Sequence, residues 1–190
     1  MDETVDRIGP ISGIASPVVA LGAIGLATTI SQPFSWTDSA LSDLGVTGGI
    51  VSILFNGGVI AGGVIAVPFG LWLLTRAQNR LERMGVCSFW LTAAAMAAIG
   101  LFPMGSSLHI PVAVSFYLLL SGSLWLYGIG NVLDGRRRRG YLTIALGIVN
   151  LGGWIVWGLR LRESVPGLAL PETVGALALA FWVTGTAVRP

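Results

Sequence analysis

The feature that most constrains this chain is the distribution of its charged residues, which leave five long stretches without any Asp, Glu, Lys or Arg. The stretches are Ile8–Thr37, Leu44–Thr75, Met84–Leu133, Gly140–Leu159 and Thr173–Val188. Only 11% of the 190 residues are charged, whereas a soluble domain has about 25%. Too few charged side chains are present to cover a surface that faces water. We therefore expect the outer surface of the protein to face lipid.

The lengths of these stretches predict six transmembrane helices. A helix needs about 20 apolar residues to cross a hydrocarbon core of ~30 Å. Met84–Leu133 is too long for one crossing, and the turn-forming segment Phe102-Pro103-Met104-Gly105-Ser106-Ser107 divides it into two. The prediction is an all-α, polytopic six-helix bundle that forms one integral-membrane domain over residues 1–190. The expected spans are 11–31, 49–74, 84–103, 110–132, 141–159 and 173–188.

The basic residues predict the orientation of the bundle. All eleven are Arg. With a cytoplasmic N-terminus, nine of them lie inside and only Arg160 and Arg162 lie outside, as the positive-inside rule requires. The nine are Arg7, Arg76, Arg80, Arg83, Arg136, Arg137, Arg138, Arg139 and Arg189. We therefore expect a multi-pass protein of the cell membrane with both termini in the cytoplasm.

Several kinds of chemistry are excluded by residues that are rare or missing. Without Lys the chain cannot form a Schiff base with retinal or pyridoxal phosphate. One cysteine, Cys87, cannot form an intrachain disulfide or a thiolate metal cluster. One histidine, His109, cannot form a multi-His metal site or a bis-His haem. We expect no metal and no cofactor.

A polar segment between the first two spans predicts a short helix in the outer membrane interface. Ser35 and Asp38 have the spacing of a capping box, and Gly45 is typical of a helix C-terminus. In this helix Leu41 and Leu44 would face the bundle.

Asp43 would then lie at the negative end of the helix dipole, which disfavours a carboxylate. It is therefore expected to have a compensating partner, with His109, Arg160 and Arg162 as candidates on the same side. His109 could serve as a general acid or base oriented by Asp43, or it could simply make a structural hydrogen bond.

Asn56 and Asn150 are expected at a similar depth in the outer leaflet, where a buried amide needs a partner. An interhelical hydrogen bond is the structural alternative for both. The residues predicted to bind a ligand are Ser42, Asp43, Asn56, His109 and Asn150.

The run Arg136-Arg137-Arg138-Arg139 follows the fourth predicted span on the cytoplasmic side. It is expected to fix the topology and to contact anionic lipid head groups, at about 1 kcal/mol per Arg. Nucleic acid is not an expected partner, because the loop is short and carries no interleaved aromatic residues.

Four motifs occur in order along the first four predicted spans. They are Phe34-Ser35-Trp36, Ala40-Leu41-Ser42-Asp43-Leu44-Gly45, Phe55-Asn56-Gly57-Gly58, and Gly100-Leu101-Phe102-Pro103 followed by His109. In these motifs the chain resembles the membrane family catalogued as domain of unknown function 998, which consists of small bacterial and archaeal proteins with a similar number of helices. The resemblance implies that Ser42, Asp43, Asn56, Pro103 and His109 are characteristic positions. It implies no reaction. The exclusive use of Arg and the richness in Gly and Ala are also typical of a GC-rich prokaryotic genome.

Three functions remain open. The preferred one is a non-catalytic binding or accessory role, in which an outward polar pocket holds a lipid or a segment of another membrane protein. The alternative is a membrane-embedded lipid hydrolase or transferase that uses Asp43 and His109. The third, a small-solute transporter, is disfavoured because no predicted span carries a charged residue near its centre and no inverted repeat is visible. The expected partners are membrane lipids, with another membrane protein as the second candidate.

Overall fold

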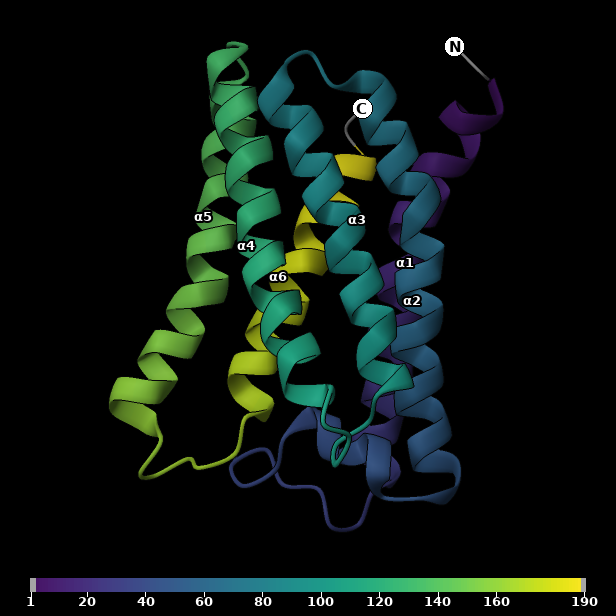
Figure 1. The fold of residues 1–190 in the computed structure, drawn as a ribbon, viewed down its shortest axis with the longest axis vertical. Helices are drawn as coiled ribbons and strands as arrows, with labels where there is room; N and C mark the ends of the chain where they lie inside the picture. Colours follow the sequence, from purple (N-terminus) through teal and green to yellow (C-terminus); the bar gives the residue numbers. More distant parts are fainter. Residues whose placement is uncertain (1–2, 189–190) are drawn as a thin grey trace.

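The structure is a computed structural model and describes residues 3–188, within which the chain is helical and contains no strand. Figure 1 shows the elements in chain order. They are α1 (Glu3–Ile30), the 3-10 helix η1 (Leu41–Val46), α2 (Gly49–Arg76), α3 (Arg80–Leu101), α4 (His109–Leu133), α5 (Arg137–Val156), the π-helix η2 (Trp157–Leu161) and α6 (Ala169–Ala187). The predicted all-α class is confirmed. Arg189, one of the arginines used to predict the orientation, lies outside the described residues.

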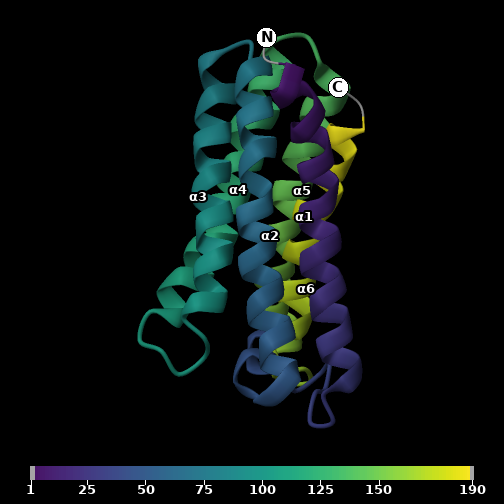
Figure 2. The same cartoon turned by 90° about the vertical axis from the view of Figure 1, so that its right-hand side faces the viewer.

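The six α-helices form a closed ring. Each helix packs against the next one in the chain, and α6 packs against α1. The long helices run side by side (Figures 1 and 2). The start of α1, the end of α6 and the α2–α3 and α4–α5 connections lie at one end, here called the terminal end (Figure 1). The other three connections, including η1, lie at the opposite end, here called the η1 end.

An aromatic cluster fills the centre of the bundle in its terminal half. Trp182 of α6 packs against Phe69 of α2, Phe89 of α3 and Tyr127 of α4, with ring centroids 5.5–6.1 Å apart. Trp72 stacks on Phe69 at 5.6 Å. All five side chains are buried. Trp182 therefore connects α6 to three helices that are not its neighbours in the chain.

Small residues allow α2 to approach its neighbours closely. Gly62 faces Ala20 of α1, and its carbonyl oxygen accepts a hydrogen bond from the Ser16 hydroxyl at 2.8 Å. On the other side, a Cβ atom added to Gly63 would lie 2.5 Å from the carbonyl oxygen of Ala93 in α3. These contacts lie within one chain and hold α1, α2 and α3 together.

Five helices of the described chain are long and apolar enough to cross a membrane: α1, α2, α3, α4 and α5 with its η2 extension. The chain is thus expected to be a multi-pass membrane protein, as predicted. The sixth predicted span corresponds to α6, which has 19 residues and carries Glu172 in its first turn. It is not among the five, so the count of six spans is not established by length and composition.

Four helices begin at least four residues earlier than predicted, α1 at Glu3, α3 at Arg80, α5 at Arg137 and α6 at Ala169. The predicted spans began after the charged residues, but the first turns of these helices contain charged residues and are still helical. In α3, the Asn79 side chain caps the helix by accepting a hydrogen bond from the Glu82 amide at 3.0 Å. In α6, Glu172 lies in the first turn, where the helix dipole favours an acidic group.

The helix predicted from Ser35 to Gly45 is shorter than expected and begins at Leu41. Asp38 does not cap it. Its carboxylate instead accepts hydrogen bonds from the hydroxyls of Ser35 and Thr37, which lower the Asp38 pKa. Leu41 and Leu44 are buried, as predicted.

We predict that Gly63→Ala destabilises the protein by about 1–3 kcal/mol, because the added methyl group must displace the α3 backbone. The measurement is the thermal unfolding midpoint of the detergent-solubilised protein. Gly57→Ala is the matched control, because Gly57 lies on the same helix with nothing within 4 Å of an added Cβ. Equal midpoints for the two variants would show that α2 and α3 are not in this close contact.

Candidate functional site

A narrow cavity lies inside the ring, between α1, α2, α3, α4, α6 and η1. Its volume is about 80 Å³. The lining of the cavity extends along α6 from Glu172 to Val183, a distance of about 16 Å at the rise of an α-helix. The cavity is therefore long and thin.

Most of the cavity wall is apolar. The α1 wall includes Ala20 and Leu21, the α3 wall Ala93 and Met96, and the α6 wall Leu179. Polar side chains gather at the η1 end, where Ser42, His109 and Glu172 line the cavity. Ser16 and Tyr117 also line the cavity, and the Ser16 hydroxyl donates to the Gly62 carbonyl oxygen. The cavity thus has one polar end and a mostly apolar body.

The segment that carries Ser42 is held by hydrogen bonds to the start of α6. The amide of Leu41 donates to the Glu172 carboxylate at 2.6 Å. The amide of Ala169 donates to the carbonyl oxygen of Ser39 at 2.9 Å. Ser42 itself is 4% exposed, and its hydroxyl oxygen has no hydrogen-bond partner. The Ser42 hydroxyl is therefore a buried polar group without a partner, on a residue that lines the cavity.

His109 is the first residue of α4 and is buried. Its Nδ1 atom lies 2.8 Å from the carbonyl oxygen of Phe102. Because a carbonyl oxygen only accepts hydrogen bonds, Nδ1 carries the proton in the neutral ring, and Nε2 is left as an acceptor. Ser42 and His109, both predicted from the sequence, therefore meet at the same cavity.

The other three predicted ligand-binding residues do not line the cavity. Asp43 accepts a hydrogen bond from the Ala40 amide at 2.8 Å. Asn56 donates to the Gly45 carbonyl oxygen at 2.9 Å, so both residues hold η1 in place. Asn150 is completely buried and donates to Tyr117 and Ser121 of α4, which is the interhelical bond considered as its structural alternative.

The reasoning that gave Asp43 a compensating partner is wrong in its premise. Because η1 begins at Leu41, Asp43 lies in its first turn, where the helix dipole favours a carboxylate. Within residues 3–188, no hydrogen bond or ion pair joins Asp43 to His109, Arg160 or Arg162.

Glu172 is the residue of this site that the sequence reasoning missed. In the sequence, Glu172 was used only to mark the end of an uncharged stretch. It is, however, a single acidic residue that directly follows Pro171 at the start of a helix. This pattern is typical of a helix N-terminus and could have marked it. In the structure it is 7% exposed and connects α6 to η1.

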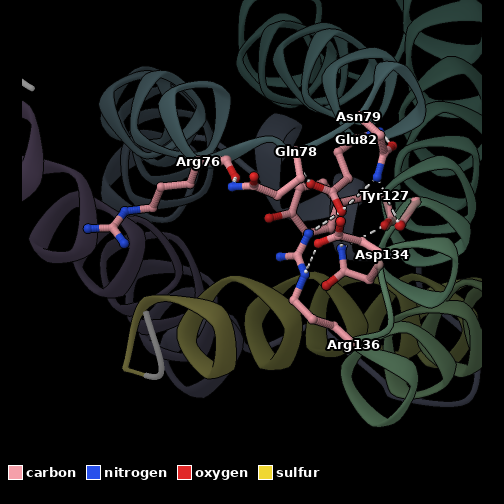
Figure 3. A network of polar contacts seen from close by, with 9 residues as sticks. Arg76, Gln78, Asn79, Glu82, Tyr127, Asp134 and Arg136 are labelled. Carbon is pink, nitrogen blue, oxygen red and sulfur yellow. Dashed lines mark hydrogen bonds and ion pairs between the residues drawn. The ribbon is translucent and has the colours of Figure 1, made fainter.

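A second polar cluster lies at the terminal end, around Glu82 (Figure 3). Glu82 is completely buried and forms an ion pair with Arg136. It also accepts hydrogen bonds from the Gln78 amide at 2.8 Å and from the Asn79 and Asn131 side chains at 3.3 Å. Every partner is a donor, so the buried carboxylate is compensated from several sides.

This cluster restrains one of the four arginines predicted to contact anionic lipid. Arg136 contacts Glu82 and, at 3.0 Å, Asp134. Burial opposes the charged form of Arg136, but its hydrogen bond and attraction to Glu82 raise the Arg136 pKa above the ordinary value. Arg137, Arg138 and Arg139 are exposed.

Comparison with known proteins identifies the family. The chain matches the family described as protein of unknown function DUF998 over residues 14–189, and it belongs to that family. The resemblance seen in the sequence motifs is thereby confirmed. No curated protein matches the chain, and no solved structure does. The family description contains no reaction, so function has to be argued from the geometry of the site.

We predict that Glu172→Ala lowers the free energy of unfolding by about 1–3 kcal/mol, because the buried Leu41 amide loses its acceptor. Glu172→Gln should cost less, since its amide oxygen can still accept that bond. Thermal unfolding in detergent is the measurement, and Glu163→Ala, at an exposed position in the α5–α6 connection, is the control. A Glu172→Ala protein as stable as the control would show that this contact does not hold η1.

Proposed function

We propose that this protein crosses the cell membrane six times and binds a membrane lipid. The hydrocarbon chain of the lipid occupies the cavity, and its polar group lies at Ser42, His109 and Glu172. The observation that carries the proposal is the distribution of polarity along the cavity, which has Ser42, His109 and Glu172 together at its η1 end and a mostly apolar wall elsewhere. A lipid has the same distribution.

The shape of the cavity favours a single hydrocarbon chain. Its lining extends over about 16 Å of α6, yet its volume is only about 80 Å³. A bulky or multiply charged solute would not fit this space, whereas an extended chain would. Burial of each methylene group of such a chain contributes about 0.8 kcal/mol.

The polar end favours a neutral head group that carries hydroxyls. The Ser42 hydroxyl can donate or accept, and Nε2 of His109 accepts from a donor. Within residues 3–188, no arginine lines the cavity, and the Glu172 carboxyl group lies at its polar end, so a phosphate would have no guanidinium partner there. Asp43 and Asn56 support the site by holding η1, without contacting the lipid.

A second candidate is a hydrolase or transferase that acts on a lipid. It is favoured by the presence of an unpartnered serine hydroxyl and a histidine in the same cavity. In that mechanism Nε2 of His109 would take the proton of Ser42, and Asp43 would have no direct part. Binding requires fewer assumptions, because it needs no hydrogen bond between Ser42 and His109.

The proposed orientation places the terminal end in the cytoplasm. The first and last described residues lie at the terminal end (Figure 1). The connections that carry most of the arginines lie there too. Six crossings are needed for this arrangement, so α6 must cross the membrane despite Glu172. The ring supports such a crossing because α6 packs against α1 and α5.

We predict that the two ends of α6 lie on opposite sides of the membrane. In a Cys87→Ser background, Glu163→Cys should react with a membrane-impermeant maleimide on intact cells. Val188→Cys, beyond the other end of α6, should react only after permeabilisation. Both positions are exposed in the folded protein. Equal labelling of the two in intact cells would mean that α6 does not cross the membrane.

We predict that filling the cavity displaces the lipid. Ala113 lines the cavity, so Ala113→Phe places a ring where the chain would lie. The fraction of protein that retains one lipid should fall at least about tenfold, which corresponds to 1.4 kcal/mol. Native mass spectrometry of protein extracted gently from its own membrane measures this fraction. Ser42→Ala, which removes one hydrogen bond, should reduce it by about two- to tenfold.

Ala145→Phe is the control, because Ala145 lies on the exposed face of α5, away from the cavity. Equal lipid retention in Ala113→Phe and Ala145→Phe would exclude the cavity as the binding site. A retained protein subunit instead of a lipid would support the accessory role with a membrane-protein partner. A cleaved lipid that becomes intact in His109→Ala would support the hydrolase.

A further inference from the structure

The cavity of the proposed function has a definite length between its polar end and its other end. Its lining extends from Phe55 to Ala66 on α2, from Ile99 to Phe89 on α3, and from Glu172 to Val183 on α6. At the rise of an α-helix, each of these stretches covers about 15–17 Å. Three helices therefore give a similar length for the cavity.

Three side chains line the end of the cavity that is remote from η1, and they are called the floor here: Ala66, Phe89 and Val183. Ala66 lies one turn before Phe69 on α2, and Val183 directly follows Trp182 on α6. The floor is therefore next to the aromatic cluster, because Phe69 and Trp182 belong to that cluster. Phe89 has the largest side chain of the three floor residues.

Aromatic rings close the space beyond the floor. The Phe89 ring centroid lies 5.7 Å from that of Phe69 and 5.5 Å from that of Trp182. Neither Phe69 nor Trp182 lines the cavity, so both lie behind Phe89. On the α1 side, a Cβ atom added to Gly13 would lie 2.5 Å from the Phe69 ring, so this ring also packs against α1. A hydrocarbon chain cannot pass such close-packed rings.

The two ends of the cavity together limit the length of a bound chain. In the proposed function the polar group lies at Ser42 and His109, and the chain ends against Phe89. A fully extended hydrocarbon chain advances about 1.3 Å per carbon, because its bonds are about 1.5 Å long and meet at tetrahedral angles. The length of about 15–17 Å thus accommodates about twelve carbons.

We propose that the cavity selects lipids by chain length, that it prefers chains of about twelve carbons, and that Phe89 determines this limit. Selection by length rests on the proposed function and adds the class of lipid to it. A shorter chain buries fewer methylene groups, and each group that enters the cavity strengthens binding by up to about fourfold. A longer chain must fold back or withdraw its polar group from Ser42 and His109.

The test uses a mixture of neutral single-chain lipids that differ only in length. The probes are saturated 1-monoacylglycerols with even chains from eight to eighteen carbons, whose head group offers two hydroxyls to the polar end of the cavity. They are added in equal amounts to the full-length protein in a neutral detergent. Native mass spectrometry then measures how much of each lipid the protein retains. Adhesion to the outer surface would increase steadily with chain length, whereas a cavity with a floor gives a maximum.

Two variants of the floor should move this maximum in opposite directions. Phe89→Leu replaces the ring by a smaller side chain and keeps the position apolar, so the maximum should shift to chains longer by about two carbons. Ala66→Leu fills space at the floor, so the maximum should shift to chains shorter by about two carbons. Val86→Ala is the matched control, because Val86 is a buried residue one turn beyond Phe89 on α3 and does not line the cavity. Its maximum should be that of the unchanged protein.

Retention that rises through eighteen carbons, or a maximum that stays in place in both floor variants, would overturn selection by length. An equal shift in Val86→Ala would overturn it too, because such a shift would indicate a general loosening of the core. In each of these cases the lipid site itself stands if Ala113→Phe still reduces retention. If the protein retains no monoacylglycerol of any length, the neutral lipid of the proposed function is wrong and selection by length falls with it.

Discussion

The packing of Trp182 determines how this bundle divides its interior. Its indole contacts rings from α2, α3 and α4 at centroid distances of 5.5–6.1 Å, and it thereby fills the terminal half. Within the two turns before Trp182, α6 presents Ala176, Leu179 and Ala180 to the same interior, and the space beside them is the cavity. The cavity thus follows from the change in side-chain size along one helix.

The other end of α6 is held by a polar contact, the hydrogen bond from Leu41 to Glu172. In an apolar protein a buried carboxylate is costly unless donors surround it. Here its donor belongs to η1, so the same contact joins α6 to the connection between α1 and α2 and holds Ser42 beside the cavity. Glu172 lowers the hydropathy of α6, but it is needed to assemble the proposed lipid site.

The helices could be predicted from the sequence because uncharged stretches and the Phe102–Ser107 turn are local features. Ser42 and His109 were found for the same reason, since both flank predicted helices on the η1 side. Glu82 and Glu172 were missed because their partners lie 54 and 131 residues away in the chain. The assignment of Asp43 was wrong because η1 begins at Leu41, six residues after the predicted start at Ser35. Asp43 therefore lies at the opposite end of the helix dipole from the end that was predicted.

The two ends of the bundle differ in how their charged groups are paired. At the η1 end, the Glu172 carboxylate accepts the Leu41 amide and lies at the same cavity as the Ser42 hydroxyl, which has no partner, and the imidazole of His109. At the terminal end, Glu82 is surrounded by donors and pairs with Arg136, whereas Arg137, Arg138 and Arg139 are exposed. The lipid proposed for the cavity therefore needs no cation at its polar end, and a phosphate there would have no arginine among the described residues to pair with.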